Sequence, residues 1–238
     1  YIKDINKYIM NTAMKKIIIL LVLFITSVKA FPQLGFFSLG YILPLSGSLP
    51  KYYIENNGGA LNKNSYESQS AFEVGFLVQP VYNFILHKDI ILGLGMDLGY
   101  YRDTYRFINY EERKKYTHVF DSLNMGGYIE GIFANIFMLG FGGGIKVPLG
   151  GSLRYDYIIE TLNYSRLKQR FDDIVIPYIK FLIGVKSFTV LGGVSLSFYF
   201  NYDFPVIKDI KSAPDTVKFS SIDLGVQIGF YISALEVR

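Results

Sequence analysis

Six charged residues stand in stretches of the chain that are otherwise mostly apolar, and ion pairing is the chemistry that their types allow. They are Glu73, Asp97, Glu130, Lys146, Lys180 and Asp223. Each falls on the strand face that carries glycine and small residues, never on the apolar face. An unpaired charge in a confined, poorly hydrated space is costly. We therefore expect Lys146 and Lys180 to pair with some of the four carboxylates. The pairs would form either a structural network or a gate along a narrow ion path.

The histidine and cysteine content argues against most catalytic and metal chemistry. Hydrolysis by a serine nucleophile needs a histidine beside a serine and a carboxylate, and the chain has only His87 and His118. The strand pattern described below puts His87 in a periplasmic turn and His118 at an extracellular strand end, both solvated. The absence of cysteine excludes disulfides, thiolate metal sites and a lipoprotein anchor. The glycine-rich stretch 140–144 lacks the closing Lys-Ser or Lys-Thr pair of a phosphate loop. We predict no enzyme, no cofactor and no metal site.

The element that must position the six charges is a β-strand with one apolar face. From Leu92 to Tyr100 every second residue is large and apolar, whereas the residues between them are three glycines and Asp97. Side chains of a strand alternate between its two faces, and here the second face is too small to be a solvated surface. Such a strand suits a narrow barrel whose outside contacts lipid. Because the pattern recurs about eight times, we predict an all-β fold, an antiparallel up-and-down transmembrane β-barrel.

The eight expected strands are joined alternately by long and short connections. They run over residues 33–45, 70–81, 89–101, 118–133, 136–147, 174–185, 188–202 and 219–232. The long connections are the polar stretches 46–68, 102–116, 148–173 and 203–216, and the short ones are 83–88, Ala134–Asn135 and Lys186–Ser187. Outer-membrane barrels have long extracellular loops and short periplasmic turns, so this order puts both termini on the periplasmic side. A soluble lipocalin-like barrel is the alternative, but its outer face would be rich in Lys, Glu and Thr.

The first 30 residues have the pattern of a targeting segment. Met14 and two lysines precede a short apolar run, and small residues suited to cleavage end at Ala30. We interpret residues 14–30 as a signal-peptide helix, residues 1–13 as an upstream extension and residues 31–238 as the barrel domain. Residues 1–30 hold five of the 24 basic and one of the 20 acidic residues, so the remaining 19 and 19 balance. The basic charge therefore indicates no nucleic-acid partner.

The last strand carries an assembly signal. Asp223, Gly225, Ile228 and Phe230 have the spacing of the C-terminal signal of outer-membrane barrels, although Tyr231 to Arg238 follow the aromatic residue. By strand number, loop pattern and signal peptide, the chain after Ala30 resembles the small eight-stranded outer-membrane proteins of the OmpA-barrel, OmpX and OmpW type. The resemblance is architectural. It implies the outer membrane of a diderm bacterium as the location, with outer-membrane lipid and the barrel-assembly machinery as partners.

Two functions are compatible with this architecture. The first is a non-enzymatic surface protein whose long loops have a structural or adhesion role and meet an extracellular ligand or a host surface. The alternative is a narrow channel or carrier for small solutes. An eight-stranded barrel is just wide enough for its own side chains to fill the lumen. We therefore expect the six charges, together with Tyr128, Tyr178 and Tyr199, to plug the bore, which favours the first function.

Overall fold

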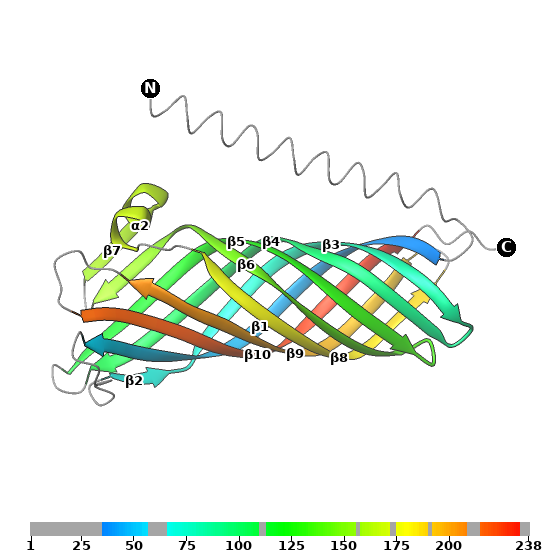
Figure 1. Ribbon diagram of the computed structural model, residues 1–238, viewed down its shortest axis with the longest axis horizontal. Coiled ribbons are helices and arrows are strands. Elements are labelled where there is room, and N and C mark those ends of the chain that lie inside the picture. Colours follow the sequence, from blue (N-terminus) through cyan, green and yellow to red (C-terminus); the bar gives the residue numbers. More distant parts are fainter. Residues whose placement is uncertain are drawn as a thin grey trace, which may run out of the picture.

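Eight long antiparallel strands close into a barrel, as predicted from the alternation of residues (Figure 1). The strands are β1 (Gly35–Asn56), β3 (Ala71–His87), β4 (Ile90–Asn109), β5 (Lys114–Phe133), β6 (Phe137–Tyr155), β8 (Ile176–Thr189), β9 (Gly192–Lys208) and β10 (Asp215–Ser233). Each pairs with the next, and β10 pairs with β1 to complete the ring. This structure is a computed structural model that describes residues 35–56, 66–109, 113–155, 158–171, 175–189, 192–208 and 215–233. The expected signal peptide and the extension before it lie outside these residues.

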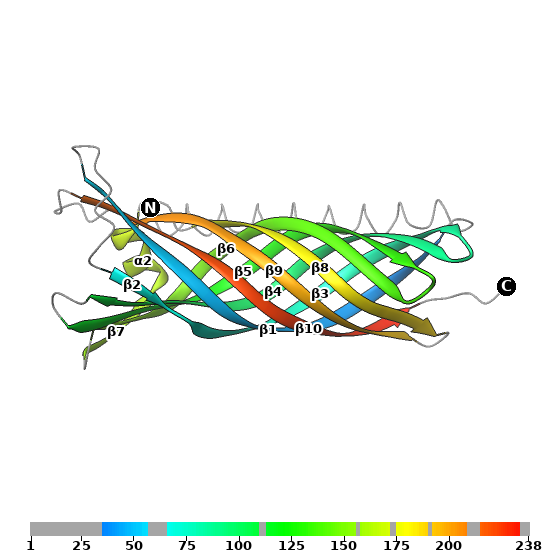
Figure 2. The same cartoon turned by 90° about the horizontal axis from the view of Figure 1, so that it is seen from below.

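The two ends of the barrel differ. At one end lie the short strands β2 (Tyr66–Gln69) and β7 (Ile158–Asn163), which pair with β4 and β6, and the helix α2 (Tyr164–Arg170) (Figures 1 and 2). At the other end the strands are joined by tight turns, such as the predicted turn at Ala134 and Asn135. Both of these residues have positive φ, 49° and 58°, the type I′ geometry that matches the twist of a hairpin. No helix among the described residues is long and apolar enough to cross a membrane.

The predicted long loops are wrong over much of their length, because the strands continue into them. β1 runs to Asn56, β4 runs to Asn109, β6 runs to Tyr155 and β9 runs to Lys208. The segment 148–173 also contains β7 and α2. A membrane-spanning strand needs only about 9 to 11 residues, so strands of 17 to 22 residues extend beyond the bilayer. There the outer face meets water and the alternation of apolar and small residues ends, although backbone pairing continues.

The turn predicted at Lys186–Ser187 is also wrong. β8 continues to Thr189, and the backbone N–H of Lys186 donates to the carbonyl oxygen of Ile136 at 2.8 Å. Lys186 and Ser187 therefore remain in a paired strand, and the Lys186 side chain points into the barrel and is buried. Two adjacent polar residues in a sequence are typical of a turn. Here they continue β8, and Lys186 lies on the same inward face of that strand as Lys180.

The apolar side chains of the barrel lie mostly on its outside. Phe141 and Phe198 are 62% and 67% exposed, whereas polar groups such as Asn83 and Asp223 are fully buried inside. This is the reverse of the distribution in a water-soluble protein. It is the distribution of a barrel whose outer wall contacts lipid, and it rules out the lipocalin-like alternative.

Candidate functional site

All six charged residues singled out in the sequence lie inside the barrel. They come from six different strands, and none is more than 5% exposed. Together with Lys186, which the sequence analysis assigned to a turn, they form three groups along the barrel. Each group has one lysine, namely Lys146, Lys180 or Lys186.

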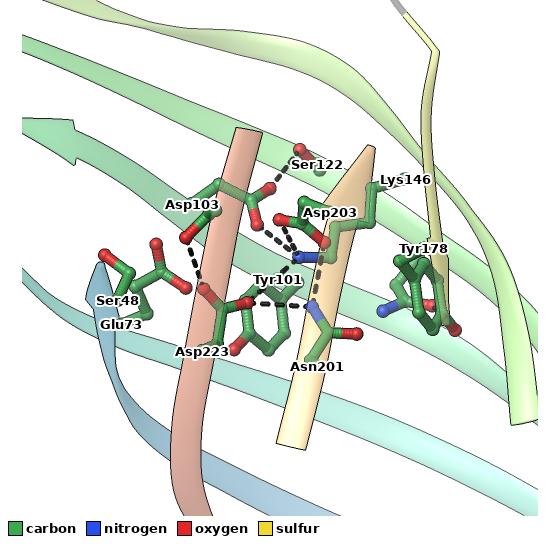
Figure 3. A network of polar contacts seen from close by, with 12 residues as sticks. Ser48, Glu73, Tyr101, Asp103, Ser122, Lys146, Tyr178, Asn201, Asp203 and Asp223 are labelled. Atoms are coloured by element: carbon green, nitrogen blue, oxygen red, sulfur yellow. Dashed lines mark hydrogen bonds and ion pairs between the residues drawn. The ribbon is translucent and has the colours of Figure 1, made fainter. Parts of the chain in front are cut away.

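Lys146 on β6 is the centre of the largest group (Figure 3). Its Nζ lies 2.6 Å from Asp103 Oδ1, 2.8 Å from Asp203 Oδ2 and 3.8 Å from Asp223 Oδ2. The same atom lies 4.3 Å from the centre of the Tyr101 ring, a cation–π contact. One ammonium thus provides the counter-charge for three buried carboxylates from β4, β9 and β10.

Amide and hydroxyl groups complete the coordination of these carboxylates. Asn201 Nδ2 donates to Asp203 Oδ1 and to Asp223 Oδ2, both at 2.8 Å, which links the two acids (Figure 3). Ser221 donates to Asp223 at 2.6 Å, and Ser122 donates to Asp103 at 3.0 Å. Each of these acids is therefore held by at least one neutral donor as well as by Lys146, which fixes its orientation.

Glu73 lies at the edge of the same group but does not pair with Lys146. Its Oε1 accepts a hydrogen bond of 2.7 Å from the backbone N–H of Thr104, and its Oε2 has no hydrogen-bond partner among the described residues. The group thus has four carboxylates and one ammonium. It depends on Lys146 for all of its positive charge within the part of the chain that the structure describes.

The second group joins Lys180 on β8 to Asp97 on β4. Lys180 Nζ pairs with Asp97 Oδ2, and Gln79 Nε2 donates to Asp97 Oδ1 at 2.6 Å. The amide oxygen of Gln79 in turn accepts from the hydroxyls of Tyr128 and Tyr231, both at 3.2 Å. A chain of polar contacts therefore crosses the bore from β8 to β10.

The third group pairs Lys186 with Glu130, nearest the tight turns. Their charged atoms are 2.5 Å apart, and Lys186 Nζ lies 3.8 Å from the centre of the Tyr231 ring. Glu130 was one of four carboxylates expected to supply partners for Lys146 and Lys180, and in the structure it pairs with Lys186 instead. Lys186 is six residues after Lys180 on β8. If the alternation of inward and outward side chains had been extended that far, it would have assigned Lys186 to the interior. The same argument applies to Asp103 and Asp203, which were assigned to loops.

An aromatic and aliphatic cluster closes the bore at the end that carries α2. Its buried members, referred to below as the plug, are Tyr105, Phe107, Phe120, Leu153, Leu162, Leu167, Phe171, Ile176 and Phe219. They come from five barrel strands as well as β7, α2 and the residue that follows α2. The rings of Phe120 and Phe219 are stacked, with centroids 6.2 Å apart. The excursion between β6 and β8 therefore supplies side chains that cover the lumen.

The two histidines lie at opposite ends of the barrel. His87 is exposed at the end of β3, where its Nδ1 accepts from the backbone N–H of Asp89 at 3.4 Å. His118 is not a solvated strand end as expected. It is buried and stacks on Phe219 at a ring distance of 5.4 Å, next to the plug. β5 begins at Lys114 rather than at residue 118, which brings His118 inside the wall.

Two small cavities lie inside the part of the barrel that the structure describes. A cavity of about 20 Å³ lies between Lys146 and Lys180, and one of about 10 Å³ lies between Gln79 and Glu130. Either volume is about that needed for a single water molecule. Among the described residues no three His, Asp or Glu side chains are arranged to hold a metal ion.

The four residues of the expected assembly signal lie on β10 where it pairs with β1. Asp223 points inward to the Lys146 group, whereas Ile228 and Phe230 point outward and Phe230 is 60% exposed. Gly225 faces Ser46 across the seam. β10 continues past Phe230 to Ser233. The placement is compatible with an assembly signal, and that role stays a prediction.

Several solved outer-membrane proteins are similar to this chain at low sequence identity. No protein-family model and no curated protein sequence matches the chain. The outer membrane protein OprG from Pseudomonas aeruginosa is 11% identical with a TM-score of 0.43, over 84% of this chain and 96% of its own. The outer membrane protease OmpT from Escherichia coli is 10% identical with a TM-score of 0.41, over 83% and 96%. Ail, the attachment invasion locus protein of Yersinia pestis, is 10% identical with a TM-score of 0.32, over 82% and 99%.

The barrel's own geometry places it in an outer membrane. Closure of β10 on β1 leaves no unpaired strand edge in the ring, which is the condition for a sheet to span a bilayer. Large apolar side chains cover the outer wall, and the hairpin turns are short at one end only. Short turns at one end and longer connections at the other are typical of bacterial outer-membrane barrels. We therefore expect the end with α2 and β7 to be the extracellular end, and it is called so below.

Proposed function

We propose that this protein is a non-conducting, non-enzymatic barrel that acts at the cell surface through its extracellular end, in a structural or interaction role. The observation that carries the proposal is the filled bore. Three lysine–carboxylate groups from Glu130 to Asp103 occupy the lumen in succession, and the plug lies beyond them. A solute would have to separate buried ion pairs and then displace packed aromatic rings.

Exposed apolar residues beyond the membrane support a role in interactions. β7 pairs with the part of β6 that extends past the bilayer, and its Ile158 and Ile159 are 68% and 62% exposed. Tyr164, the first residue of α2, is also exposed. Large apolar side chains exposed to water on both faces of a short strand can serve as contact points for a partner. The β7–α2 excursion is thus the part of the described surface best suited to meet a partner.

Single-channel recording tests the filled bore. We expect purified, refolded protein in planar bilayers to show no steady openings over the range of voltages that the bilayer tolerates. A variant with Phe120→Ala and Phe219→Ala, which removes two stacked rings of the plug, should also stay closed because the three lysine groups remain below it. Large, steady openings of the wild-type protein would contradict the proposal and favour a narrow channel.

A further inference from the structure

β7 has one paired edge and one unpaired edge. It pairs with β6 along its whole length, from Ile158 to Asn163, and among the described residues no strand pairs with its other edge. β8 begins at Ile176 and pairs with β6 only up to Lys146, so it stops on the membrane side of β7. β9 ends at Lys208, and the register across β6, β8 and β9 puts this end one residue below Asn163. The outer edge of β7 is therefore free of described strands at the extracellular tip (Figures 1 and 2).

β7 lies at the height where the outer wall meets water. Arg102 and Asp121 form an outward ion pair at 2.8 Å, and both side chains are partly exposed. Asp121 is in register with Gly150, which is in register with Asn163, the last residue of β7. The other residues of β7 lie further from the membrane than this pair. A partner in the aqueous phase can therefore reach the free edge.

The backbone groups of Ile159 and Thr161 point away from β6. Two residues join Tyr155 of β6 to Ile158 of β7, and the pair that closes such a tight hairpin exchanges backbone hydrogen bonds. Hydrogen-bonded and non-hydrogen-bonded pairs alternate along an antiparallel ladder, so Ile159 and Thr161 occupy non-hydrogen-bonded pairs. In agreement, Arg166 Nη1 donates to the carbonyl oxygen of Thr161 at 3.5 Å. The free edge thus offers the N–H groups of both residues and the carbonyl oxygen of Ile159.

Nothing in the sequence of β7 blocks this edge. Natural sheets protect exposed edges with proline or lysine, and neither residue occurs in β7, whose sequence is IIETLN. Its one charged residue, Glu160, is already paired with Arg170 at 3.0 Å. Ile158 and Ile159 are exposed on opposite faces of the strand, and a strand added alongside would cover part of both.

Two arginines lie beside the free edge. Arg154 of β6 is exposed and in register with Ile159, and Arg166 of α2 reaches the edge at the carbonyl oxygen of Thr161. Among the described residues neither arginine has a carboxylate partner. Guanidinium groups bind carboxylates with charge-assisted, often bidentate hydrogen bonds. Acidic side chains on an added strand would therefore be matched by these two groups.

We propose that β7 binds an extended, acidic peptide segment of a partner protein by strand addition. The inference rests on the proposed surface role and names the kind of partner. Backbone hydrogen bonds along Ile159 and Thr161 hold the segment, as in other cases of strand addition, whereas Arg154 and Arg166 select carboxylate side chains. A second copy of this chain fits less well, since antiparallel pairing of two β7 strands would bring the same arginines together.

Binding of a synthetic strand tests the proposal. The probe is a fluorescein-labelled peptide in which valine and threonine alternate, with two glutamates at each end, and its anisotropy is measured with the full chain folded in detergent micelles. We expect saturable binding by the wild type. Thr161→Pro removes an N–H group of the free edge without touching the pairing with β6, and it should bind about tenfold more weakly, since one backbone hydrogen bond is lost. Thr161→Ala keeps that N–H group and should retain binding.

A second set of variants tests the charge. Arg154→Gln with Arg166→Gln should bind the acidic peptide about tenfold more weakly, because two charge-assisted contacts are lost. The same double variant should bind a peptide with glutamine in place of glutamate as the wild type does. Lys168→Gln, on the exposed face of α2, is the matched control for the overall charge of the barrel and should leave binding unchanged.

Three outcomes would overturn the proposal. The first is no saturable binding of the acidic peptide by the wild type, and the second is equal binding by the wild type and Thr161→Pro. The third is equal binding of a peptide methylated at alternate backbone nitrogens, which cannot pair along a strand edge. Heat-modifiable gel mobility confirms that each variant is folded. Single-channel recording of the wild type tests the filled bore separately, so a closed barrel that fails to bind the peptide contradicts only strand addition.

Discussion

The three interior lysines differ in how many carboxylates depend on them. Lys180 and Lys186 each pair with one acid, Asp97 and Glu130. Lys146 lies within 4 Å of three acids, and all of these groups are almost completely buried. The cost of a buried charge is set by what remains unpaired after its partner is removed. Loss of Lys146 should therefore be the most damaging of the three changes.

We expect Lys146→Met to destabilise the barrel by about 3 to 5 kcal/mol, the usual cost of removing one partner of a buried ion pair. The measurement is the temperature at which the folded, fast-migrating gel form converts to the unfolded form. Lys168→Met on the exposed face of α2 is the control, and its effect should stay within about 0.5 kcal/mol.

Neutralising the partners of Lys146 identifies the residues that carry this effect. Adding Asp103→Asn and Asp203→Asn to Lys146→Met should recover part of the lost stability, because these are the carboxylates that Lys146 contacts most closely. Adding Glu73→Gln should recover less, since Glu73 Oε1 is held by the Thr104 backbone. If Lys146→Met migrates and melts like the wild type, the Lys146 group has no stabilising role.

At the scale of the strand, the seam between β1 and β10 is the element that turns a sheet into a barrel. Gly225 sits in this seam opposite Ser46. A Cβ atom at Gly225 would lie 2.2 Å from the carbonyl oxygen of Leu45 and 2.8 Å from the Cα of Ser46. Both are backbone atoms, so the strands would have to separate to accept it. Gly127 on β5 is different, because a Cβ there would meet nothing closer than 3.8 Å.

Gly225→Ala should therefore impair closure of the barrel, and Gly127→Ala should not. The expected result for Gly225→Ala is a loss of the heat-modifiable gel form, or a clearly lower conversion temperature, after refolding into detergent micelles. Gly127→Ala makes the same chemical change on the lipid-facing wall and should refold like the wild type. Equal behaviour of the two variants would show that the tight contact at the seam does not limit closure.

At the scale of the whole molecule, the two ends of the barrel have different structures and face different compartments. The end with tight turns projects little beyond the wall, whereas the strands at the other end pass the Arg102–Asp121 pair and continue into β7 and α2. The plug belongs to this second end and covers the lumen from the extracellular side. The extended strands that carry β7 and α2 at the surface are thus also the strands that supply the plug of the lumen.

Proteolysis of intact cells tests this orientation. Trypsin should cut at Arg113, in the turn before β5, and at Lys168 on α2, because both are exposed at the extracellular end. Lys88, in the turn between β3 and β4, should be cut only after the outer membrane is permeabilised. Cleavage at Lys88 in intact cells would invert the topology. Lys186 would report nothing about orientation, since its side chain is buried.

Residue alternation alone was enough to predict the barrel and the face on which each charge lies. Asp97 stands between Met96 and Leu98, so if the apolar face meets lipid the carboxylate must point inward. That inference is local, because it depends only on the twofold period of a strand. The same period would have assigned Asp103, Lys186 and Asp203 to the interior if the strands had been extended past the apolar belt.

Only the tertiary structure decided which charges meet. Lys146 contacts Asp103 and Asp203, which are 43 and 57 residues away in the chain. Glu130 pairs with Lys186, a lysine that the sequence analysis assigned to a turn. The reason is physical. The height of a residue in a barrel depends on the stagger of its strand against all the others, and closure of the ring sets that stagger. Alternation determines the face of a side chain, whereas closure determines its neighbours across the bore.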